Sequence, residues 1–270
     1  MRRLKNWGRV RPNPAGVETG VEGGGLMRIE ALEETLFRVS FLNRGAWACD
    51  RTWAIAPSGE IPWEGRARDD ISGFACPAFG TEEGPEGVTL HTGQMRVTIA
   101  APLHLRWQVR TGDGWADFAG DRPTGAYLLG RRDHAAEHYM LRKPGERHYG
   151  LGEKAGPLER SGRRYEMRNL DALGYDAAHT DPLYKHVPFV LTRTPEAGSF
   201  SLFYDTAAPC WFDLGNELDN YHSPYRSFRT ADGDLVYYLR WAPDLRTLVR
   251  EQVRLTGGTA FPPRWSLGYS

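Results

Sequence analysis

A polar, glycine-containing loop at residues 169–176 carries the side chains best suited to chemistry. It brings together the amide of Asn169, the carboxylates of Asp171 and Asp176, and the phenol of Tyr175. Such a stretch is too polar to be core, and binding residues concentrate on loops of this kind. From this pattern alone, Asp171 is expected to cap its own loop in an Asx-turn, and ligand binding by its carboxylate is the alternative. Asn169 is expected to hold the backbone of the loop. Tyr175 and Asp176 are expected either to line a pocket rim or to pack against a neighbouring part of the protein.

Two other groups of residues look chemically suggestive but do not define a site. His134 and His138 are four residues apart, a spacing that would place both on one face of a helix. Their flanks instead indicate a loop entering a strand, and no third ligand is suitably spaced. The Gly-Leu-Gly run at 150–152 lacks the third glycine and the following helix of a dinucleotide site. We therefore predict no metal ion and no cofactor.

The composition limits the possible partners. The chain has 34 basic and 34 acidic residues, so nothing favours nucleic acid or an anionic membrane. No run approaches the ~20 apolar residues of a membrane helix. Cys49, Cys76 and Cys210 are widely spaced and indicate neither a disulfide framework nor a zinc site. We expect a soluble protein in a reducing compartment, the cytoplasm.

Most of the chain alternates apolar and polar residues in short runs, which is the pattern of half-buried β-strands. Residues 36–41 place Phe37, Val39 and Phe41 on one face, and residues 103–109 alternate in the same way. Turn formers separate these runs. The sequence therefore predicts an all-β fold, an antiparallel sandwich.

We predict one folded domain between two less ordered ends. Residues 1–25 are rich in Gly, Pro and charge and are expected to be a flexible leader. Residues 26–258 form the sandwich and end in one helix, which starts near Asp244 and stops at two glycines. The apolar stripe of this helix is predicted at Leu245, Leu248, Val249 and Val253. Residues 259–270 are expected to be a linker and the start of another strand.

Four segments are similar, in this order, to the N-terminal part of glycoside hydrolase family 31, the α-glucosidase and α-xylosidase family: YGLGE at 149–153, NLD…GYD at 169–176, DPLYKHVPF at 181–189 and FPPRWSLGY at 261–269. The resemblance implies a galactose mutarotase-like β-supersandwich. It also implies that the loop reaches over the mouth of a (β/α)8 barrel, where Asp171 contacts an α-linked glucoside or oligosaccharide. A carboxylate that accepts from two sugar hydroxyls makes short, charge-assisted bonds. Arg168 and Leu170 depart from the family pattern beside this residue, which affects substrate preference.

The resemblance also implies what this chain lacks. In the family, the last of the four segments leads into the first strand of the barrel, and the barrel carries both catalytic aspartates. Retaining glycosidases need two carboxyl groups about 5 Å apart. Nothing in the sequence pairs two of its 34 acidic residues in this way. We therefore expect no catalytic residue here, and no activity without the C-terminal barrel domain as partner.

Three other functions stay open at this level. The chain could be a stand-alone carbohydrate-binding module, because aromatic rings suit the apolar faces of sugars, although they also fill β cores. It could be a mutarotase-like sugar epimerase, which needs a histidine and a glutamate facing each other in a pocket. It could also be an interdomain scaffold with Trp265 and Tyr269 exposed. Titration with maltose and NMR of glucose anomers distinguish the first two.

Overall fold

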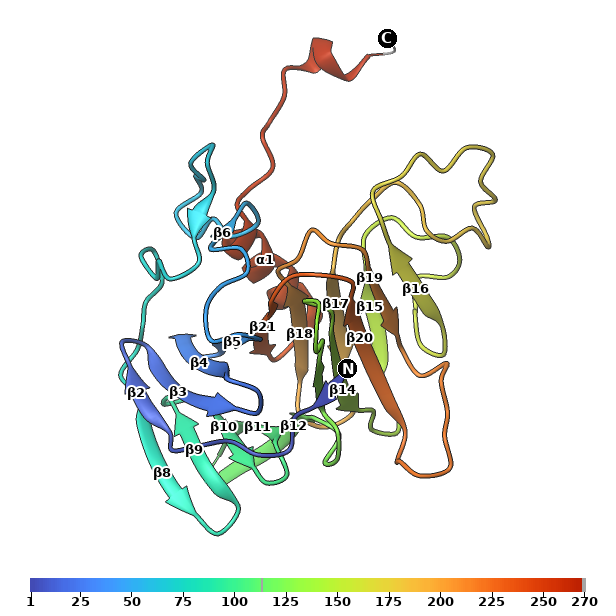
Figure 1. The fold of residues 1–270 in the computed structure, drawn as a ribbon. Helices are drawn as coiled ribbons and strands as arrows, with labels where there is room; N and C mark the ends of the chain where they lie inside the picture. The colour runs from blue at the N-terminus through green and yellow to red at the C-terminus, as the bar shows by residue number, and fades with distance from the viewer. Residues whose placement is uncertain (113, 269–270) are drawn as a thin grey trace.

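The computed structural model describes residues 1–112 and 114–268 and shows a β-sandwich with a single α-helix among them (Figure 1). The strands of the described sheets pair antiparallel. This confirms the prediction of an all-β, antiparallel sandwich with one helix near the C-terminus. The longer strands have apolar faces, which the stacked sheets bury against one another.

One layer is an eight-stranded sheet. Its strands, in spatial order, are β15 (Arg147–Gly150), β17 (Phe189–Arg193), β18 (Ser199–Tyr204), β21 (Leu235–Ala242), β5 (Leu36–Leu42), β4 (Gly25–Glu33), β3 (Gly16–Val21) and β2 (Arg11–Asn13). The chain enters and leaves this sheet several times, so segments far apart in the sequence become neighbours.

Two smaller sheets share the core with it. The six-stranded sheet has the order β1 (Arg2–Arg3), β13 (Tyr127–Leu129), β14 (Ala136–Leu141), β20 (Tyr225–Thr230), β19 (Cys210–Asp213) and β16 (Arg164–Met167). The five-stranded sheet has the order β12 (Gly114–Gly120), β11 (His104–Thr111), β10 (Met95–Ala100), β9 (Gly87–His91) and β8 (Gly80–Gly84). A separate short pair consists of β6 (Arg51–Thr52) and β7 (Arg66–Ala67).

Aromatic rings fill the core between the layers. Phe37 of β5 meets Trp107 of β11 edge to face, with ring centroids 5.8 Å apart. Phe118 of β12 lies 5.7 Å from Phe200 of β18. The apolar faces predicted for residues 36–41 and 103–109 are buried in this cluster.

The outer face of β5 is buried as well, because residues 43–79, here called the cover segment, pack across it. Leu36 of β5 and Tyr238 of β21 form a second apolar cluster with Ile55 of the cover segment and Leu255 of the helix. β5 is therefore buried along its whole length.

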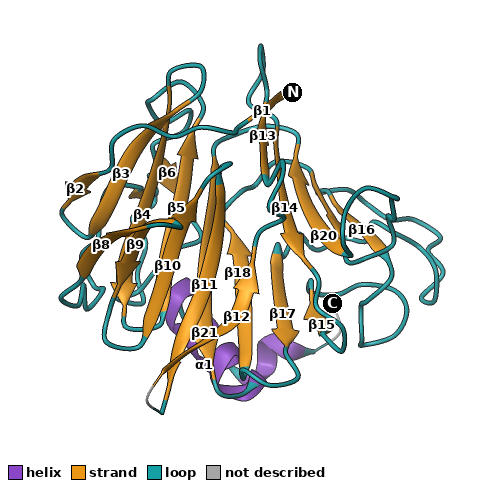
Figure 2. Cartoon of the chain, turned by 90° about the horizontal axis from the view of Figure 1, so that it is seen from below, coloured by secondary structure: helices purple, strands orange, loops and turns teal. Residues whose placement is uncertain are grey.

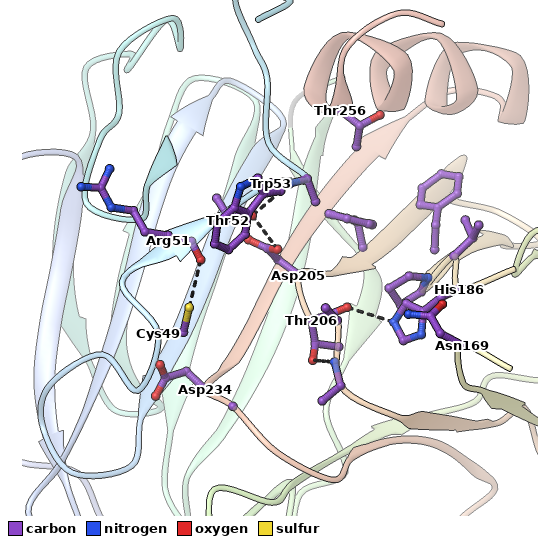
Figure 3. Close-up of a pocket in the computed structure, with 18 of the residues that line it drawn as sticks. Cys49, Arg51, Thr52, Trp53, Asn169, His186, Asp205, Thr206, Asp234 and Thr256 are labelled. Atoms are coloured by element: carbon purple, nitrogen blue, oxygen red, sulfur yellow. Dashed lines mark hydrogen bonds between the residues drawn. The ribbon is translucent and has the colours of Figure 1, made fainter. Parts of the chain in front are cut away.

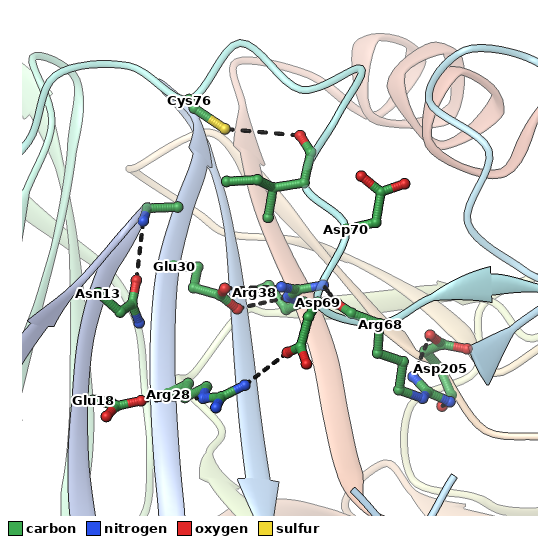
Figure 4. Close-up of polar contacts among 12 residues, drawn as sticks. Asn13, Glu18, Arg28, Glu30, Arg38, Arg68, Asp69, Asp70, Cys76 and Asp205 are labelled. Atoms are coloured by element: carbon green, nitrogen blue, oxygen red, sulfur yellow. Dashed lines mark hydrogen bonds and ion pairs between the residues drawn. The ribbon is translucent and has the colours of Figure 1, made fainter. Parts of the chain in front are cut away.

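A buried ion pair lies beneath the cover segment. Arg38 of β5 donates to both carboxylate oxygens of Glu30 on β4, from Nε at 2.7 Å and Nη2 at 2.9 Å. Its Nη1 donates to the carbonyl oxygen of Arg68 in the cover segment at 2.6 Å (Figure 4). The guanidinium thus joins two strands to the segment that covers them.

Residues 1–25 are part of the sandwich, which corrects the expectation of a flexible leader. β3 pairs along its length with β4, and Leu4 and Val17 are buried. The glycine content of residues 1–25 suggests flexibility, but Gly16 is needed for close packing of two strands. A Cβ on Gly16 would lie 2.1 Å from the carbonyl oxygen of Ile29. Glycine at this position lets two strands approach closely.

The helix α1 (Leu245–Thr256) packs against β17, β18 and β21, and Figure 2 shows it lying across those strands. The Asp244 carboxylate caps its N-terminus by accepting from a backbone N–H of the first turn at 2.8 Å. Leu248 is buried, as predicted. Val249 and Val253 are 47% and 48% exposed, so the predicted apolar stripe is wrong at these positions. The helix buries a narrower face than the spacing of its apolar residues suggests.

A buried polar cluster joins β15, β17 and β20. Arg226 donates from Nη1 to Oγ1 of Thr192 at 2.9 Å, and Nδ1 of His148 lies 3.3 Å from the same guanidinium nitrogen. A guanidinium can only donate, so Nδ1 accepts and the imidazole is neutral. Burial and the nearby positive charge of Arg226 lower the pKa of His148 to about 2.

We expect His148 to make the folded state less stable in acid. The unfolded chain protonates this side chain near its ordinary pKa of about 6.5, whereas the folded protein resists protonation down to about pH 2. Its contribution to the free energy of unfolding is complete above pH ~6.5 and falls by at most ~1.4 kcal/mol per pH unit below it. Urea unfolding at about pH 7 and about pH 5 should show a larger loss for the wild type than for His148→Gln.

The carboxyl group of Glu146, which lies beside Arg226, changes the free energy of unfolding with pH in the opposite direction. Burial raises the pKa of Glu146, so this residue favours the folded state more as the pH falls. Because Glu146 is present in both proteins, its contribution cancels in the comparison. Equal losses for wild type and variant would contradict the assignment to His148.

Candidate functional site

A large hollow lies beside the predicted binding loop. Its volume is about 830 Å³, within the range of ligand pockets. The cover segment, helix α1, the end of β18 and the loop between β16 and β17 surround it (Figure 3). This last segment, residues 168–188, is called the binding loop below. The apolar part of the lining includes Trp53, Val187, Pro188, Phe189 and Phe203.

Asp205, just after β18, holds one wall of the hollow in place. Its carboxylate accepts from Oγ1 of Thr52 at 2.8 Å and pairs with Arg68 at 2.6 Å. Only 5% of the Asp205 side chain is exposed, so this contact is shielded from solvent. The carboxylate therefore ties β6 and the residue after β7 to the eight-stranded sheet, and Trp53 is carried to the edge of the hollow (Figure 3).

The YGLGE turn supports the returning end of the binding loop. Gly150, Leu151 and Gly152 all have φ in the left-handed region, at +97°, +66° and +67°. The N–H of Leu151 donates to the carbonyl oxygen of Phe189 at 2.7 Å, and the Leu151 side chain is fully buried. A Cβ on Gly152 would lie 2.8 Å from Val187. Both glycines are therefore needed where the turn passes the start of β17.

We predict that Gly150→Ala destabilises the fold by ~2 kcal/mol more than Gly162→Ala. Both glycines have positive φ, +97° and +73°. A Cβ at position 150 would lie 2.6 Å from the carbonyl oxygen of Phe189, whereas nothing lies within 4 Å of one at position 162. The left-handed conformation costs both alanines a similar ~1–2 kcal/mol, so the difference measures the clash. Similar unfolding midpoints for the two variants would show that β15 and β17 can move apart enough to accommodate the new Cβ without a loss of stability.

The binding loop is anchored by a buried ion pair. Lys154, whose side chain is fully buried, donates from Nζ to Oδ1 of Asp181 at 2.8 Å and also to the carbonyl oxygen of Glu166. The other carboxylate oxygen of Asp181 accepts from the backbone N–H of Glu166. His186 bonds through Nε2 to the carbonyl oxygen of Thr206 at 3.0 Å. Two points in the second half of the loop, Asp181 and His186, are thus attached to the sandwich.

The structure brings Asp171, Tyr175 and Tyr184 together on the exposed part of the loop. The rings of Tyr175 and Tyr184 meet edge to face, with centroids 6.1 Å apart. Tyr184 donates to the carbonyl oxygen of Ala172 at 3.2 Å, which closes the loop on itself. Partial burial and the nearby Asp171 carboxylate raise the pKa of Tyr184. Asp171 itself is exposed, so its carboxylate is accessible to a ligand.

The other two predicted residues lie in different surroundings. Asn169 lines the hollow, near His186 (Figure 3). Asp176 faces its own turn, where Oδ1 accepts from the N–H of Ala178 at 2.7 Å. This hydrogen bond lowers the pKa of Asp176. Asp176 therefore forms an Asx-turn, the arrangement considered in the sequence for Asp171. Ligand binding by Asp171 stays a prediction.

Sequence reasoning missed most of the hollow. Thr52, Trp53 and Asp205 belong to its walls. Thr52 and Trp53 come more than a hundred residues before both the binding loop and Asp205 in the sequence. Trp53 appears in the sequence only as part of a short apolar run. No spacing rule connects these residues, because tertiary packing alone makes them neighbours.

A histidine and a carboxylate do meet, but in the core. Nε2 of His138 lies 2.9 Å from Oδ1 of Asp121, and neither side chain has any exposure. Nδ1 is 2.9 Å from the hydroxyl of Tyr204, and the imidazole stacks between Tyr127 and Tyr237 at 4.8 Å from each. A sugar cannot reach this pair without opening the core. The His138–Asp121 pair is part of the core of the sandwich and gives no support to the mutarotase alternative.

The topology, the anchored loop and the adjoining hollow define a galactose mutarotase-like β-domain. The structure superposes over its whole length on 30% of the Flavobacterium johnsoniae family 31 dextranase solved with isomaltotriose, with a TM-score of 0.80 and 22% identity. Residues 26–213 match the model of the glycosyl hydrolase 31 N-terminal galactose mutarotase-like domain. The chain belongs to this family, which confirms the resemblance seen in its sequence.

Two curated relatives are α-glucosidases. Alpha-glucosidase 2 of Bacillus thermoamyloliquefaciens is 31% identical over 121 residues, which are 45% of this chain and 15% of that protein. The α-glucosidase of Saccharolobus solfataricus is 31% identical over 120 residues, 44% of this chain and 16% of its own length. The chain thus aligns with less than a fifth of each relative.

A further solved structure has the same fold over most of this chain. The cycloalternan-forming enzyme of Listeria monocytogenes superposes on 98% of this chain and 23% of its own, with a TM-score of 0.73 and 17% identity. Within residues 1–112 and 114–268, no helix has the length and apolar character to cross a bilayer.

Proposed function

We propose that this domain supplies one wall of an α-glucoside-binding pocket, which a catalytic (β/α)8 barrel domain completes. The observation that supports this is the exposed Asp171 carboxylate beside two tyrosine rings, on a loop anchored at Asp181 and His186. Tyrosine rings suit the apolar faces of a sugar, and a carboxylate suits its hydroxyls. The two relatives described above are α-glucosidases, which supports an α-linked glucoside as substrate.

The partner surface is the end of the sandwich that carries the binding loop. Figure 1 shows the loop, the β6–β7 segment and the C-terminal segment projecting from the same end. Exposed apolar side chains gather on these segments, and an exposed surface of this kind marks an interaction site. They are Trp53, Trp63, Leu173, Phe261, Trp265 and Leu267.

We further propose that residues 259–268 lead from the sandwich toward the barrel. They include the short 3-10 helix η1 (Arg264–Leu267), and Phe261 is fully exposed. Tyr269, expected to be exposed with Trp265, lies outside the described residues. A cytoplasmic location is proposed from the three cysteines, which are all free: Cys49, Cys76 and Cys210.

Turnover of p-nitrophenyl α-glucoside tests the proposal. The purified 270-residue chain is expected to be inactive, because the catalytic carboxylates belong to the barrel. A polypeptide that joins this domain to the barrel is expected to be active and sensitive to Asp171→Ala. Turnover by the isolated chain that Asp171→Ala abolishes would overturn the division of roles.

A further inference from the structure

A second hollow lies on the outer face of the six-stranded sheet. Its volume is about 540 Å³, and it shares no lining residue with the hollow beside the binding loop. It is formed by the outward side chains of β14, β20, β19 and β16, together with residues just beyond these strands. Nothing in the proposed function uses this surface.

The strand register explains why the sheet is hollowed here. One row across the sheet reads Glu137, Arg229, Trp211 and Glu166, from β14 to β16. The adjacent row on the same face reads Tyr139, Ser227, Asp213 and Arg164. Ser227 is the smallest side chain in either row. A small residue among large neighbours leaves a depression in an otherwise filled sheet face.

Both guanidinium groups around this depression are paired with carboxylates. Arg229 pairs with Glu137 at 3.1 Å, and Arg164 pairs with Asp213 at 3.0 Å and with Glu217 at 3.2 Å. Glu137 and Asp213 are nearly buried, with 10% and 5% of their side chains exposed, so they are fixed acceptors. Three carboxylates surround two guanidinium groups, so no unpaired guanidinium attracts an anion, and the paired groups favour a neutral ligand rich in hydrogen-bonding groups.

Trp211 gives the depression an apolar wall. It stands on the outer face of β19, partly exposed, between the charged side chains of Glu166 and Arg229. An outward-facing tryptophan within a charged row has no apolar partner in that row, so its ring is free to contact a flat ligand. Tyr139 lies on the opposite side of Ser227 and donates to Glu137 at 2.8 Å. The Ser227 hydroxyl makes no hydrogen bond to a described side chain, so it is available to a ligand.

We propose that this depression binds a neutral oligosaccharide, with a pyranose ring against Trp211 and its hydroxyls over Ser227, Glu137 and Arg229. The chemistry matches, because a pyranose has an apolar C–H face and a rim of hydroxyls that donate and accept. The site would hold a carbohydrate chain on the sandwich without taking part in bond cleavage. It is independent of the binding loop, so either proposal can fail without the other.

Calorimetric titration of the 270-residue chain with maltotriose tests this site. Saturable binding is expected, with a dissociation constant on the order of 1 mM. Trp211→Ala is expected to weaken binding at least ~10-fold by removing the ring. Ser227→Phe is expected to abolish it by filling the depression, whereas Ser227→Ala keeps the space and should weaken it far less. Circular dichroism and the melting temperature establish that each variant is folded.

Two controls separate this site from the others. Glu82→Ala, which removes an exposed carboxylate of β8 on another sheet, should leave maltotriose binding unchanged. Binding at the depression is lost in Ser227→Phe, whereas binding at the loop is lost in Asp171→Ala. Sorbitol, an acyclic polyol without a flat face, should bind more weakly than maltotriose. The proposal is overturned by a folded wild type that shows no saturable binding, or by binding that is lost in Asp171→Ala and kept in Ser227→Phe.

Discussion

Asp171→Ala is expected to lower kcat/KM for an α-glucoside by about 100-fold in an enzyme that joins this domain to its barrel. On the proposed function, the carboxylate accepts from two sugar hydroxyls, and each charge-assisted bond contributes ~1.5–3 kcal/mol. At the lower end of this range the two bonds together contribute ~3 kcal/mol, which corresponds to a loss somewhat above ~100-fold. The loop is anchored through Lys154 and Asp181, so a neighbouring residue cannot easily move in to compensate. Steady-state kinetics with p-nitrophenyl α-glucoside measure the effect.

Asp176→Ala is the matched control for this experiment. It removes the same charge from the same loop, but the Asp176 carboxylate already accepts from Ala178 and faces its own turn. We expect a change in kcat/KM below ~10-fold, caused by a less ordered turn. If both variants lost activity equally, loop order and not a direct contact of Asp171 would explain the result.

Glu30→Ala is expected to reduce the free energy of unfolding by ~3–5 kcal/mol. Its partner Arg38 is 3% exposed and would keep a buried, uncompensated charge. The guanidinium also bonds the cover segment at Arg68, so its displacement would loosen the wall that carries Trp53 (Figure 4). Urea unfolding followed by circular dichroism gives the difference directly.

Two further variants sharpen this prediction. Glu18→Ala breaks the neighbouring pair with Arg28, whose 3.2 Å contact is partly exposed, and should cost only ~0–1 kcal/mol. Replacing Glu30 by Leu and Arg38 by Met together should restore much of the stability, because no buried charge is left unpaired. A cost for Glu30→Ala as small as for Glu18→Ala would mean that water reaches the guanidinium.

The sequence alone determined the features that depend on near neighbours along the chain. Alternation over residues 36–41 and 103–109 predicted the strands and their inward faces, because the period of two is a property of the extended backbone. The YGLGE run at 149–153 was one of the segments that resembled the family, and the structure shows it as a turn with positive φ. The order of four such segments was enough to indicate the family.

Features that depend on pairing between distant segments were decided only by the tertiary structure. Glycines in residues 1–25 suggested flexibility, but contact with β4 makes Gly16 a packing requirement. Spacing on the helix placed Val253 inward, but the position of the strands beneath it exposes that side chain. The depression at Ser227 exists because three other strands set large side chains around it, and register is a long-range property that no local pattern encodes.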